Sequence, residues 1–276
     1  MYIHELETAG RLAREAGRAA FAFYGAVVAE WSEAGSPVTA ADRASNELII
    51  SGLREAFPAD AILSEELEDD AARLEHERVW IVDPLDGTKE FLAQNGEFAV
   101  MIGLAVRGEA VLGAVHLPAT DTTYLGAVGL GSWREAGGVR QRIACRAEGG
   151  RPLRLVGSRS HGAPLFEAMR AALGITDVAV CGSVGVKCVR IVDGERDLYL
   201  HPVSYLKEWD TCAPEALVRA AGGSVTDCLG MPLRYNKPVP VQPHGIVACV
   251  PGELDAVLER VRRVYLEGAA GVGEGA

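Results

Sequence analysis

The apolar run from Val79 to Val82 is followed at once by Asp-Pro, and this junction constrains the fold more than any other stretch. Four apolar residues bounded by a turn signal predict a buried strand. The strand should break at Asp-Pro, because the residue before a proline is restricted to extended backbone. Gly87 then supplies whatever backbone angles a tight turn needs. We therefore expect the strand to deliver Asp83 and Asp86 to a loop at its carboxyl end, where ligands bind in open α/β sheets.

Asp83 and Asp86 can converge on one hard cation, and the backbone carbonyl of Leu85 can join them as a further oxygen ligand. Mg²⁺ prefers oxygen ligands and usually keeps waters and substrate phosphate oxygens as well. If Gly87 and Thr88 open a helix, its N–H groups would attract a phosphate to the same place. The pattern D-x-x-D-G also arises from two ordinary surface turns, and on these residues alone that alternative is the commoner one.

The composition indicates a globular protein with a large core and an acidic balance. The chain has 276 residues, of which 49% are hydrophobic, enough for one large domain or two closely packed ones. A formal net charge of −11 argues against a nucleic-acid-binding surface. The same charge means that an anionic substrate would need bound cations and a few placed lysines or arginines.

The targeting and redox features are those expected of a cytoplasmic protein. Met1 to Glu7 are mixed and charged, which is not the pattern of a secretory signal. No uninterrupted apolar stretch approaches the roughly 20 residues of a membrane helix, so no membrane contact is expected. The six cysteines are scattered without a C-x-x-C pair and predict reduced thiols.

The first half of the chain predicts helices followed by a meander of strands. Apolar residues at helical spacing predict a helix over 3–30. A second helix should run from a cap at Thr39 or Asp42 to about Phe57. Strands are predicted over 61–63, 79–82, 98–106, 110–117 and 122–128, in a mixed or antiparallel sheet. The charged residues 68–78 are expected to form an exposed loop, with a mobile flap as one option.

The second half alternates short strands with helices, which favours α/β layers. A change of domain is expected near residue 150 and divides the chain into 1–150 and 151–276. Strands are predicted over 153–156, 197–199 and 246–250, and helices over 184–192, 210–221 and 252–266. The glycine- and alanine-rich tail 268–276 is expected to be disordered.

Several polar residues beside these elements have an ordinary structural explanation. They are Thr39, Asp42, Glu65, Glu66, His161, Lys187 and Asp210. Helix capping explains Thr39, Asp42 and Asp210, and charged side chains elsewhere are mostly exposed to solvent. Spacing alone connects none of them with Asp83 and Asp86.

The longer motifs resemble those of a known superfamily. D-P-L-D-G-T-K-E-F from Asp83, followed by N-G-E-F, is similar to the metal-binding motif of the inositol monophosphatase superfamily. W-D-T-C-A-P from Trp209 with A-A-G-G resembles its second signature, and T-A-A-D and E-E match shorter elements. Lys89 and Glu90 are most like the 3′(2′),5′-bisphosphate nucleotidases. The resemblance implies an α/β (α+β) fold, the layered αβαβα sandwich of the inositol monophosphatase and fructose-1,6-bisphosphatase type, with the active site between the two halves.

The resemblance also implies a metal-dependent hydrolytic site. Its ligands would be Glu65, Asp83, the Leu85 carbonyl, Asp86 and Asp210, which would hold two or three Mg²⁺ ions. Glu65 and Thr88 would aim an activated water, Asp42 would orient Thr88, and the N–H groups of Gly87 and Thr88 would bind phosphate oxygens. Inhibition by Li⁺ is implied in the same way.

Two further motifs resemble nucleotide-binding elements of the bisphosphate nucleotidases: S-R-S-H from Ser158 and S-x-G-x-K from Ser183. The implied substrate-binding residues are Asp86, Gly87, Thr88, Lys89, Ser158, Arg159, His161, Ser183, Lys187 and Asp210. Together these motifs favour hydrolysis of 3′-phosphoadenosine 5′-phosphate to AMP and phosphate. An inositol or other sugar monophosphatase is the alternative on the same machinery, and a non-catalytic metal- or nucleotide-binding module is the alternative of another class. The expected partner is a small-molecule phosphate ester, and pairing of the chain with a second copy as a homodimer is left open.

Overall fold

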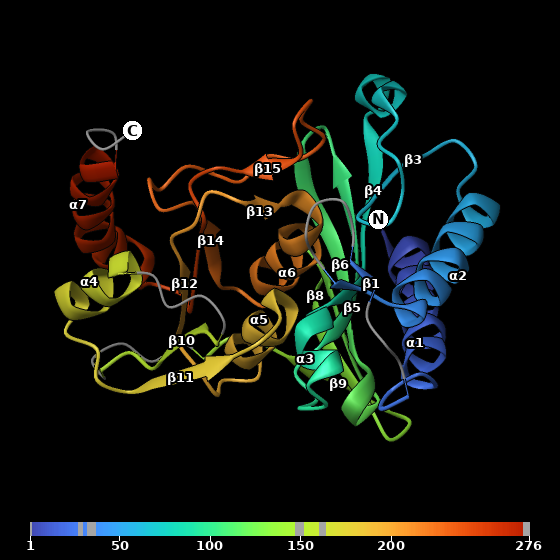
Figure 1. Ribbon diagram of the computed structural model, residues 1–276, viewed down its shortest axis with the longest axis horizontal. Helices are drawn as coiled ribbons and strands as arrows, with labels where there is room; N and C mark the ends of the chain where they lie inside the picture. Colours follow the sequence, from blue (N-terminus) through green and yellow to red (C-terminus); the bar gives the residue numbers. More distant parts are fainter. Residues whose placement is uncertain (1, 27–29, 32–36, 147–151, 160–163, 273–276) are drawn as a thin grey trace.

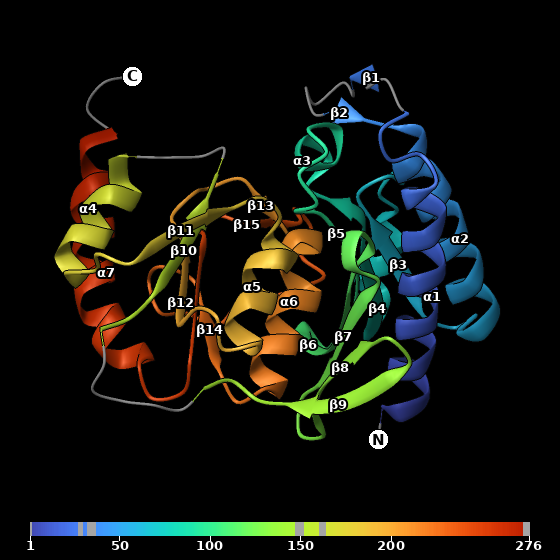
Figure 2. The same cartoon turned by 90° about the horizontal axis from the view of Figure 1, so that it is seen from below.

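Five alternating layers of helices and sheets make up the structure, a computed structural model that describes residues 2–26, 30–31, 37–146, 152–159 and 164–272. Two sheets are separated by one pair of helices, and each sheet carries a further pair on its outer face (Figures 1 and 2). This arrangement confirms the αβαβα sandwich that the resemblance implied.

The larger sheet has seven strands in the order β3-β4-β5-β6-β7-β8-β9. Its strands are β3 (Ala61–Ser64), β4 (Arg78–Asp86), β5 (Ala99–Val106), β6 (Glu109–Leu117), β7 (Thr122–Ala127), β8 (Gly131–Ala136) and β9 (Val139–Ile143). Only β3 and β4 pair in parallel, and the other neighbours are antiparallel. The predicted mixed sheet of the first half is therefore confirmed.

Two helices cover the outer face of this sheet. They are α1 (Ile3–Phe21) and α2 (Ala40–Ala56). Their apolar sides form one core cluster with the sheet, in which Leu12 and Ile49 join Trp80 and Val100. Burial of such large side chains contributes on the order of 2 kcal/mol each. Short elements complete this half: β1 (Glu30–Trp31), β2 (Pro37–Val38), η1 (Ala71–Glu75), α3 (Thr88–Leu92) and η2 (Pro118–Thr120).

The second sheet has five strands in the order β11-β10-β12-β16-β14. They are β11 (Val178–Cys181), β10 (Leu155–Ser158), β12 (Leu198–His201), β16 (Ile246–Cys249) and β14 (Ser224–Thr226). Helices α5 (Val184–Val192) and α6 (Glu208–Ala220) lie between the sheets, and α4 (Pro164–Leu173) and α7 (Leu254–Val272) cover the outer face. A two-stranded ribbon, β13 (Leu206–Lys207) with β15 (Val241–Gln242), leads into α6. The main core cluster contains residues of both halves, so the boundary predicted near 150 stays a prediction.

A row of three glycines lets α6 lie directly on the larger sheet. Gly103, Gly113 and Gly126 stand opposite one another on β5, β6 and β7. A Cβ atom at Gly113 would come within 2.2 Å of the Ala213 carbonyl oxygen of α6. A Cβ atom at Gly126 would come within 2.7 Å of the helix backbone. Since no side chain could fit in this row without a shift, the glycines fix how closely α6 approaches the sheet.

The sequence predicted that this strand breaks at Asp-Pro. In the structure, β4 continues through Pro84 to Asp86. Its register against β5 shifts between Asp83 and Asp86, because three steps along β4 match two along β5. A bulge of this kind tolerates Pro84, which has no N–H to donate to the ladder. Asp83 and Asp86 are consequently held by paired strand and not by a loose loop.

Two predicted helix ends and one predicted loop are also wrong. The first helix ends at Phe21 and not near residue 30, because a turn over 22–26 brings Tyr24 onto the rings of Phe91 and Phe98. The last helix continues to Val272, so the predicted disorder is wrong for residues 268–272, where alanine favours helix. Residues 68–78 are not simply an exposed loop, since they contain η1 and the buried side chain of Arg73.

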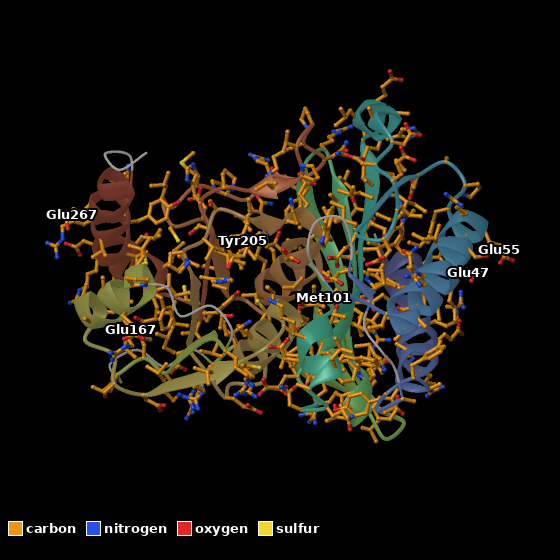
Figure 3. The ribbon with its side chains drawn as sticks, in the orientation of Figure 1. Glu47, Glu55, Met101, Glu167, Tyr205 and Glu267 are labelled. Atoms are coloured by element: carbon orange, nitrogen blue, oxygen red, sulfur yellow. The ribbon has the colours of Figure 1, made fainter. Side chains whose placement is uncertain are left out.

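The surface and the cysteines agree with the composition. Figure 3 shows Glu47 and Glu55 on α2, and Glu167 and Glu267 on α4 and α7, all exposed on the outer helices. Part of the negative charge is thus solvated and far from the inner layers. All six cysteines are buried free thiols, as predicted. Within the described ranges, no helix has the length and apolarity to cross a membrane.

Candidate active site

The bulge at the end of β4 fixes the backbone around Asp83. Its Oδ1 accepts a hydrogen bond from the N–H of Leu85 at 3.0 Å. From α2, the Ser45 hydroxyl donates to the carbonyl of Pro84 at 2.7 Å and braces the bulge from behind. The second oxygen of Asp83, Oδ2, is buried and has no hydrogen-bond partner among the described residues. An orphaned buried carboxylate oxygen is costly unless a cation satisfies it.

Glu65 lies beside this bulge because β3 runs parallel to β4. The N–H of Glu65 donates to the carbonyl of Val82 at 3.2 Å, which places Glu65 at the end of β3, next to Asp83. Glu65 is exposed, whereas Asp83 is buried. The pair therefore combines one carboxylate in the protein interior with one at the mouth of the site.

Asp86 connects the larger sheet with the inner helix α5. Its Oδ2 accepts hydrogen bonds from the Ser183 hydroxyl and from the N–H of Gly185 at 2.8 Å. Ser183 also caps α5, since its hydroxyl accepts from the N–H of Val186. A carboxylate at a helix N-terminus is stabilised by the helix dipole. The sequence did not predict this contact, because it joins residues 97 positions apart.

Asp210 comes from the first turn of α6. Its Oδ2 accepts from the N–H of Lys207 at 2.6 Å. Lys207 is the N-cap of α6, so the prediction that Asp210 is the N-cap is wrong, although the carboxylate does bond to the end of the helix from its third position. The same carboxylate lies close enough to Asp83 and Glu65 to raise their pKa values. The glycine row beneath α6 sets the approach that makes this possible.

Burial and mutual repulsion shift these carboxylates in the same direction. Burial, then Glu65, Asp86 and Asp210, raises the pKa of Asp83 well above its ordinary value. Burial, followed by Asp86, raises the pKa of Asp210 to about 7. Desolvation of its carboxyl group by surrounding protein atoms, followed by repulsion from Asp210, also raises the pKa of Glu65. Because the residue as a whole is exposed, solvent weakens this shift. Like-charged groups gathered in this way favour a bound cation.

The donor set fits a hard divalent cation. Every candidate ligand is an oxygen atom, which suits Mg²⁺ better than softer metals. Among the described residues, no three acidic, histidine or cysteine side chains are already arranged around one metal position. The raised pKa values are compatible with the lack of such a cluster, because electrostatic repulsion acts over longer distances than metal coordination. In addition, a protein donor holds one oxygen each of Asp83, Asp86 and Asp210.

Thr88 and Asp42 form a second, smaller arrangement beside the carboxylates. The Thr88 hydroxyl lies 3.2 Å from Asp42 Oδ1 and 3.2 Å from the Leu85 carbonyl oxygen. Asp42 is buried, and its Oδ2 accepts from the N–H and hydroxyl of Thr39 in a capping box. Burial raises the pKa of Asp42, and these hydrogen bonds oppose the shift. Asp42 is thus both a cap and the neighbour of Thr88 that the resemblance implied.

Gly87 allows the turn that presents Thr88. It is the residue before α3, with φ of 93°, in the left-handed region that favours glycine. A Cβ atom there would lie 2.9 Å from the Glu97 carbonyl oxygen and 3.3 Å from the Ser183 Cβ. Lys89, in the first turn of α3, is exposed. The helix predicted to begin at this turn is confirmed.

The predicted substrate side of the site is less complete. Arg159 is exposed, but its guanidinium forms hydrogen bonds of 2.8 to 3.1 Å with both carboxylate oxygens of Glu97. Glu97 also accepts from the N–H of Gly182 at 2.8 Å, and these donors together lower its pKa against the opposing effect of burial. Ser158 is half-buried at the end of β10. The predicted residue His161 lies outside the described residues.

Lys187 is not the surface charge that its residue type suggested. Only 2% of its surface is exposed, and its Nζ donates to the Ser183 carbonyl at 2.9 Å. It also lies 5.4 Å from the centre of the Tyr199 ring. Burial lowers its pKa, and the nearby Asp86 opposes the shift. Its described contacts support the loop that holds Asp86, and direct contact with a nucleotide stays a prediction.

Glu97 is a residue whose place in the site the sequence did not reveal. Glu97 belongs to the N-G-E-F motif, but nothing in the spacing of that motif indicates Arg159, which is 62 positions away. A carboxylate in a glycine-containing turn just before a buried strand was the only available signal.

Comparison with known proteins agrees with this geometry. The model of the inositol monophosphatase family matches residues 4–264. The chain is 41% identical over 239 residues to the 3′(2′),5′-bisphosphate nucleotidase CysQ of Salmonella typhimurium, covering 84% of this chain and 94% of that protein. It is 38% identical to the 3′-phosphoadenosine 5′-phosphate phosphatase of Mycobacterium leprae, covering 82% of each.

A solved structure leads to the same family. The crystal structure of CysQ from Bacteroides thetaiotaomicron, a bacterial member of the inositol monophosphatase family, superimposes with a TM-score of 0.77 and 32% sequence identity. The match covers 89% of this chain and 97% of that one. The chain therefore belongs to the inositol monophosphatase family.

Proposed function

We propose that this protein is a Mg²⁺-dependent phosphomonoesterase that hydrolyses 3′-phosphoadenosine 5′-phosphate to AMP and phosphate. The observation that carries the proposal is that Glu65, Asp83, Asp86 and Asp210 lie within electrostatic range of one another, so that they raise one another's pKa values. Relatives about 40% identical are named for this activity. Phosphatases of the inositol monophosphatase family are metal-dependent, which supports the proposed cofactor.

The metal would be held by Glu65, Asp83, Asp86, Asp210 and the Leu85 carbonyl. When bound, divalent cations at such a site activate water and stabilise charge on the leaving oxygen. Two or three ions fit the number of oxygen ligands that these residues offer. The orphaned Oδ2 of Asp83 is the observation that best matches a ligand role.

The protein groups around the metal would position the attacking water. Thr88 has one hydroxyl proton, and donating it to Asp42 Oδ1 leaves its lone pairs free to accept from water. Glu65, at the mouth of the site, can accept the water's other proton. The water oxygen would bond to phosphorus as the P–O bond to the 3′ oxygen breaks. The proton accepted by Glu65 would return through solvent to the leaving 3′ oxygen, and the water's second proton would remain on the released phosphate. The N–H groups of Gly87 and Thr88 would bind the equatorial phosphate oxygens, on which charge develops.

The substrate preference is proposed from Lys89, Ser158, Arg159, His161, Ser183 and Lys187. A nucleotide with two phosphates brings extra negative charge into an acidic protein, so nearby cations are needed. Arg159 is the exposed cation best placed for this role, provided that it exchanges Glu97 for a phosphate. We also propose a location in the cytoplasm and sensitivity to Li⁺, and we leave the homodimer as a prediction for size-exclusion measurements.

The test compares phosphate release from 3′-phosphoadenosine 5′-phosphate and from inositol 1-phosphate, each with Mg²⁺ and with a chelator. We expect the nucleotide to be hydrolysed faster, and Asp83→Asn to abolish turnover while the protein stays folded by circular dichroism. Faster turnover of inositol 1-phosphate would support the sugar monophosphatase alternative. Absence of turnover on both substrates would support a non-catalytic module.

A further inference from the structure

One buried arginine joins the segment that follows Glu65 to the far half of the molecule. Arg73, in η1, is only 3% exposed. Its Nε and Nη2 donate to the two carboxylate oxygens of Asp69 at 2.6 and 2.8 Å. Asp69 follows Glu65 by four residues, so this pair fixes the short segment that leaves the end of β3.

The other side of the same guanidinium contacts the segment before β15. Arg73 Nη1 donates to Asn236 Oδ1 at 2.8 Å, and Nη2 donates to the Lys237 carbonyl at 2.9 Å. Asn236 returns the contact, because its Nδ2 donates to the carbonyls of Arg73 and His76 at 3.0 and 3.2 Å. The two segments are 163 positions apart in the chain and are joined by hydrogen bonds in both directions.

This segment in turn holds the start of α6. The N–H groups of Asn236 and Lys237 donate to the two carboxylate oxygens of Glu208 at 2.7 and 3.0 Å. Glu208 is fully buried and is the first residue of α6, two positions before Asp210. Asn236 has φ of 58°, a left-handed conformation that asparagine tolerates better than most residues. A continuous set of hydrogen bonds thus runs from Asp69, four residues after Glu65, through Arg73 to Glu208, two residues before Asp210.

We propose that Arg73 is a positioning residue that sets the spacing between Glu65 and Asp210 and thereby the affinity for the divalent cation. The inference rests on the proposed function and names a residue that touches neither substrate nor metal. Its four acceptors lie around one planar group: two oxygens of Asp69, Oδ1 of Asn236 and the Lys237 carbonyl. Lysine cannot satisfy them together, because its ammonium lacks the planar fork of the guanidinium.

The expected consequence is a loss of metal affinity with little change in nucleotide binding. Partners that orient metal ligands typically change metal affinity by about 10- to 100-fold when removed. The hydrogen bonds of the Arg73 side chain go to Asp69, Asn236 and Lys237, and none of them involves Arg159 or Glu97. A general loss of folding stability would instead lower the melting temperature without changing the affinity of the folded protein for Mg²⁺.

The experiment measures Mg²⁺ binding to the full-length protein by isothermal titration calorimetry, with MgCl₂ alone, and the Mg²⁺ dependence of nucleotide hydrolysis. In Arg73→Ala and Arg73→Lys we expect Mg²⁺ to bind about tenfold more weakly. The KM for the nucleotide at saturating Mg²⁺ should stay within about twofold of the wild type. Arg107→Ala is the matched control, because Arg107 forms an exposed ion pair with Glu77 at 3.0 Å and should leave Mg²⁺ binding unchanged.

Asn236→Ala carries the test if Arg73→Ala does not fold. It keeps the Arg73 and Asp69 pair and the bond from Arg73 to the Lys237 carbonyl, but removes the three hydrogen bonds of the Asn236 side chain to Arg73 and His76. Mg²⁺ should therefore bind about threefold more weakly or worse. Folded variants with wild-type Mg²⁺ affinity would overturn the inference, and so would a wild-type protein that binds no Mg²⁺. A wild type that binds Mg²⁺ but hydrolyses no nucleotide would overturn the proposed function alone, because calorimetry still reports on Arg73.

Discussion

Two carboxylates on the helix α6 have similarly raised pKa values but different surroundings. Burial raises the pKa of both Asp210 and Glu215 to about 7. Glu215 faces the protein core, where it accepts from the Tyr235 hydroxyl and pairs with Arg219 at 3.1 Å. Asp210 faces other carboxylates, and Asp86 adds to its shift. Asp210 and Glu215 therefore differ in the groups that surround them and not in the size of their pKa shift.

This difference shows what a metal site needs besides burial. Arg219 and Tyr235 compensate Glu215 from within the protein, so nothing further is required there. Around Asp210, Lys207 and Lys187 oppose the shift, but burial and the repulsion from Asp86 outweigh them, so a cation from solution would relieve it. The first three predictions below change one of these two environments and leave the other intact, and the fourth concerns the substrate side.

The largest expected effect is on turnover. Asp210→Asn should lower kcat for the nucleotide by about 10³-fold or more, because it removes a charged ligand that stabilises the transition state through the metal. Glu215→Gln should change kcat by less than about threefold. Steady-state phosphate release measures both variants. Equal losses in the two would mean that Asp210 acts only through the stability of α6.

The next effect is on stability in the presence of metal. Mg²⁺ at about 100 times its dissociation constant should stabilise the wild type by about 2.7 kcal/mol. For a protein of this size that corresponds to a rise in Tm of roughly 5 to 10 °C. Differential scanning calorimetry should show most of this rise lost in Asp210→Asn and retained in Glu215→Gln. A rise of the same size in both variants would contradict the assigned ligand set.

The pH dependence of the metal-free protein gives a smaller effect. A carboxyl group whose pKa is raised in the folded state holds a proton that the unfolded chain has already released. For Glu215, with an ordinary pKa of 4.5 and a folded value of about 7, this stabilisation is complete below pH 4.5 and is lost as the pH rises through about 7. Glu215→Gln should therefore match the wild type near pH 5 and have a higher Tm near pH 8, measured in chelator. Parallel pH profiles would show that Glu215 is not protonated in the folded state.

The smallest expected effect concerns the paired cation on the substrate side. Glu97→Gln should weaken the hold on Arg159 and lower the KM for the bisphosphate nucleotide by about twofold, since exposed ion pairs are weak. The KM for inositol 1-phosphate, which lacks a second phosphate, should not change. If the KM rises for both substrates, Glu97 serves mainly to support the turn at Gly182.

The sequence revealed local structure well where a hydrogen bond links near neighbours. Thr39 was correctly predicted as a helix N-cap. Asp42 and Asp210 are not N-caps but stand three residues after one, where each carboxylate accepts from the N–H of the capping residue. In both Asp42 and Asp210, the oxygen that accepts this bond from the capping residue is Oδ2. Asp42 then turns Oδ1 toward Thr88, and that contact is tertiary. A capping pattern can be recognised from a few consecutive residues, whereas the contact between Asp42 and Thr88 depends on the whole fold. Only the resemblance to a family therefore linked these residues to the site.

Element ends and long-range contacts were the parts that the sequence could not supply. The bulge in β4 depends on its pairing with β5, and the end of α1 depends on the aromatic contacts of Tyr24. The partners of Arg73 and Glu97 lie 163 and 62 positions away. No periodic pattern encodes such separations, because they are set by how the layers stack.

The row formed by Gly103, Gly113 and Gly126 has a consequence for how the protein can vary. Adding one methyl group at Gly113 would push against the Ala213 carbonyl, since the two atoms would be 2.2 Å apart. The helix would have to lift off the sheet, and Asp210 would move with it, away from Asp83 and Asp86. Activity could then be lost through a substitution in the deep interior that removes no charge and touches no substrate.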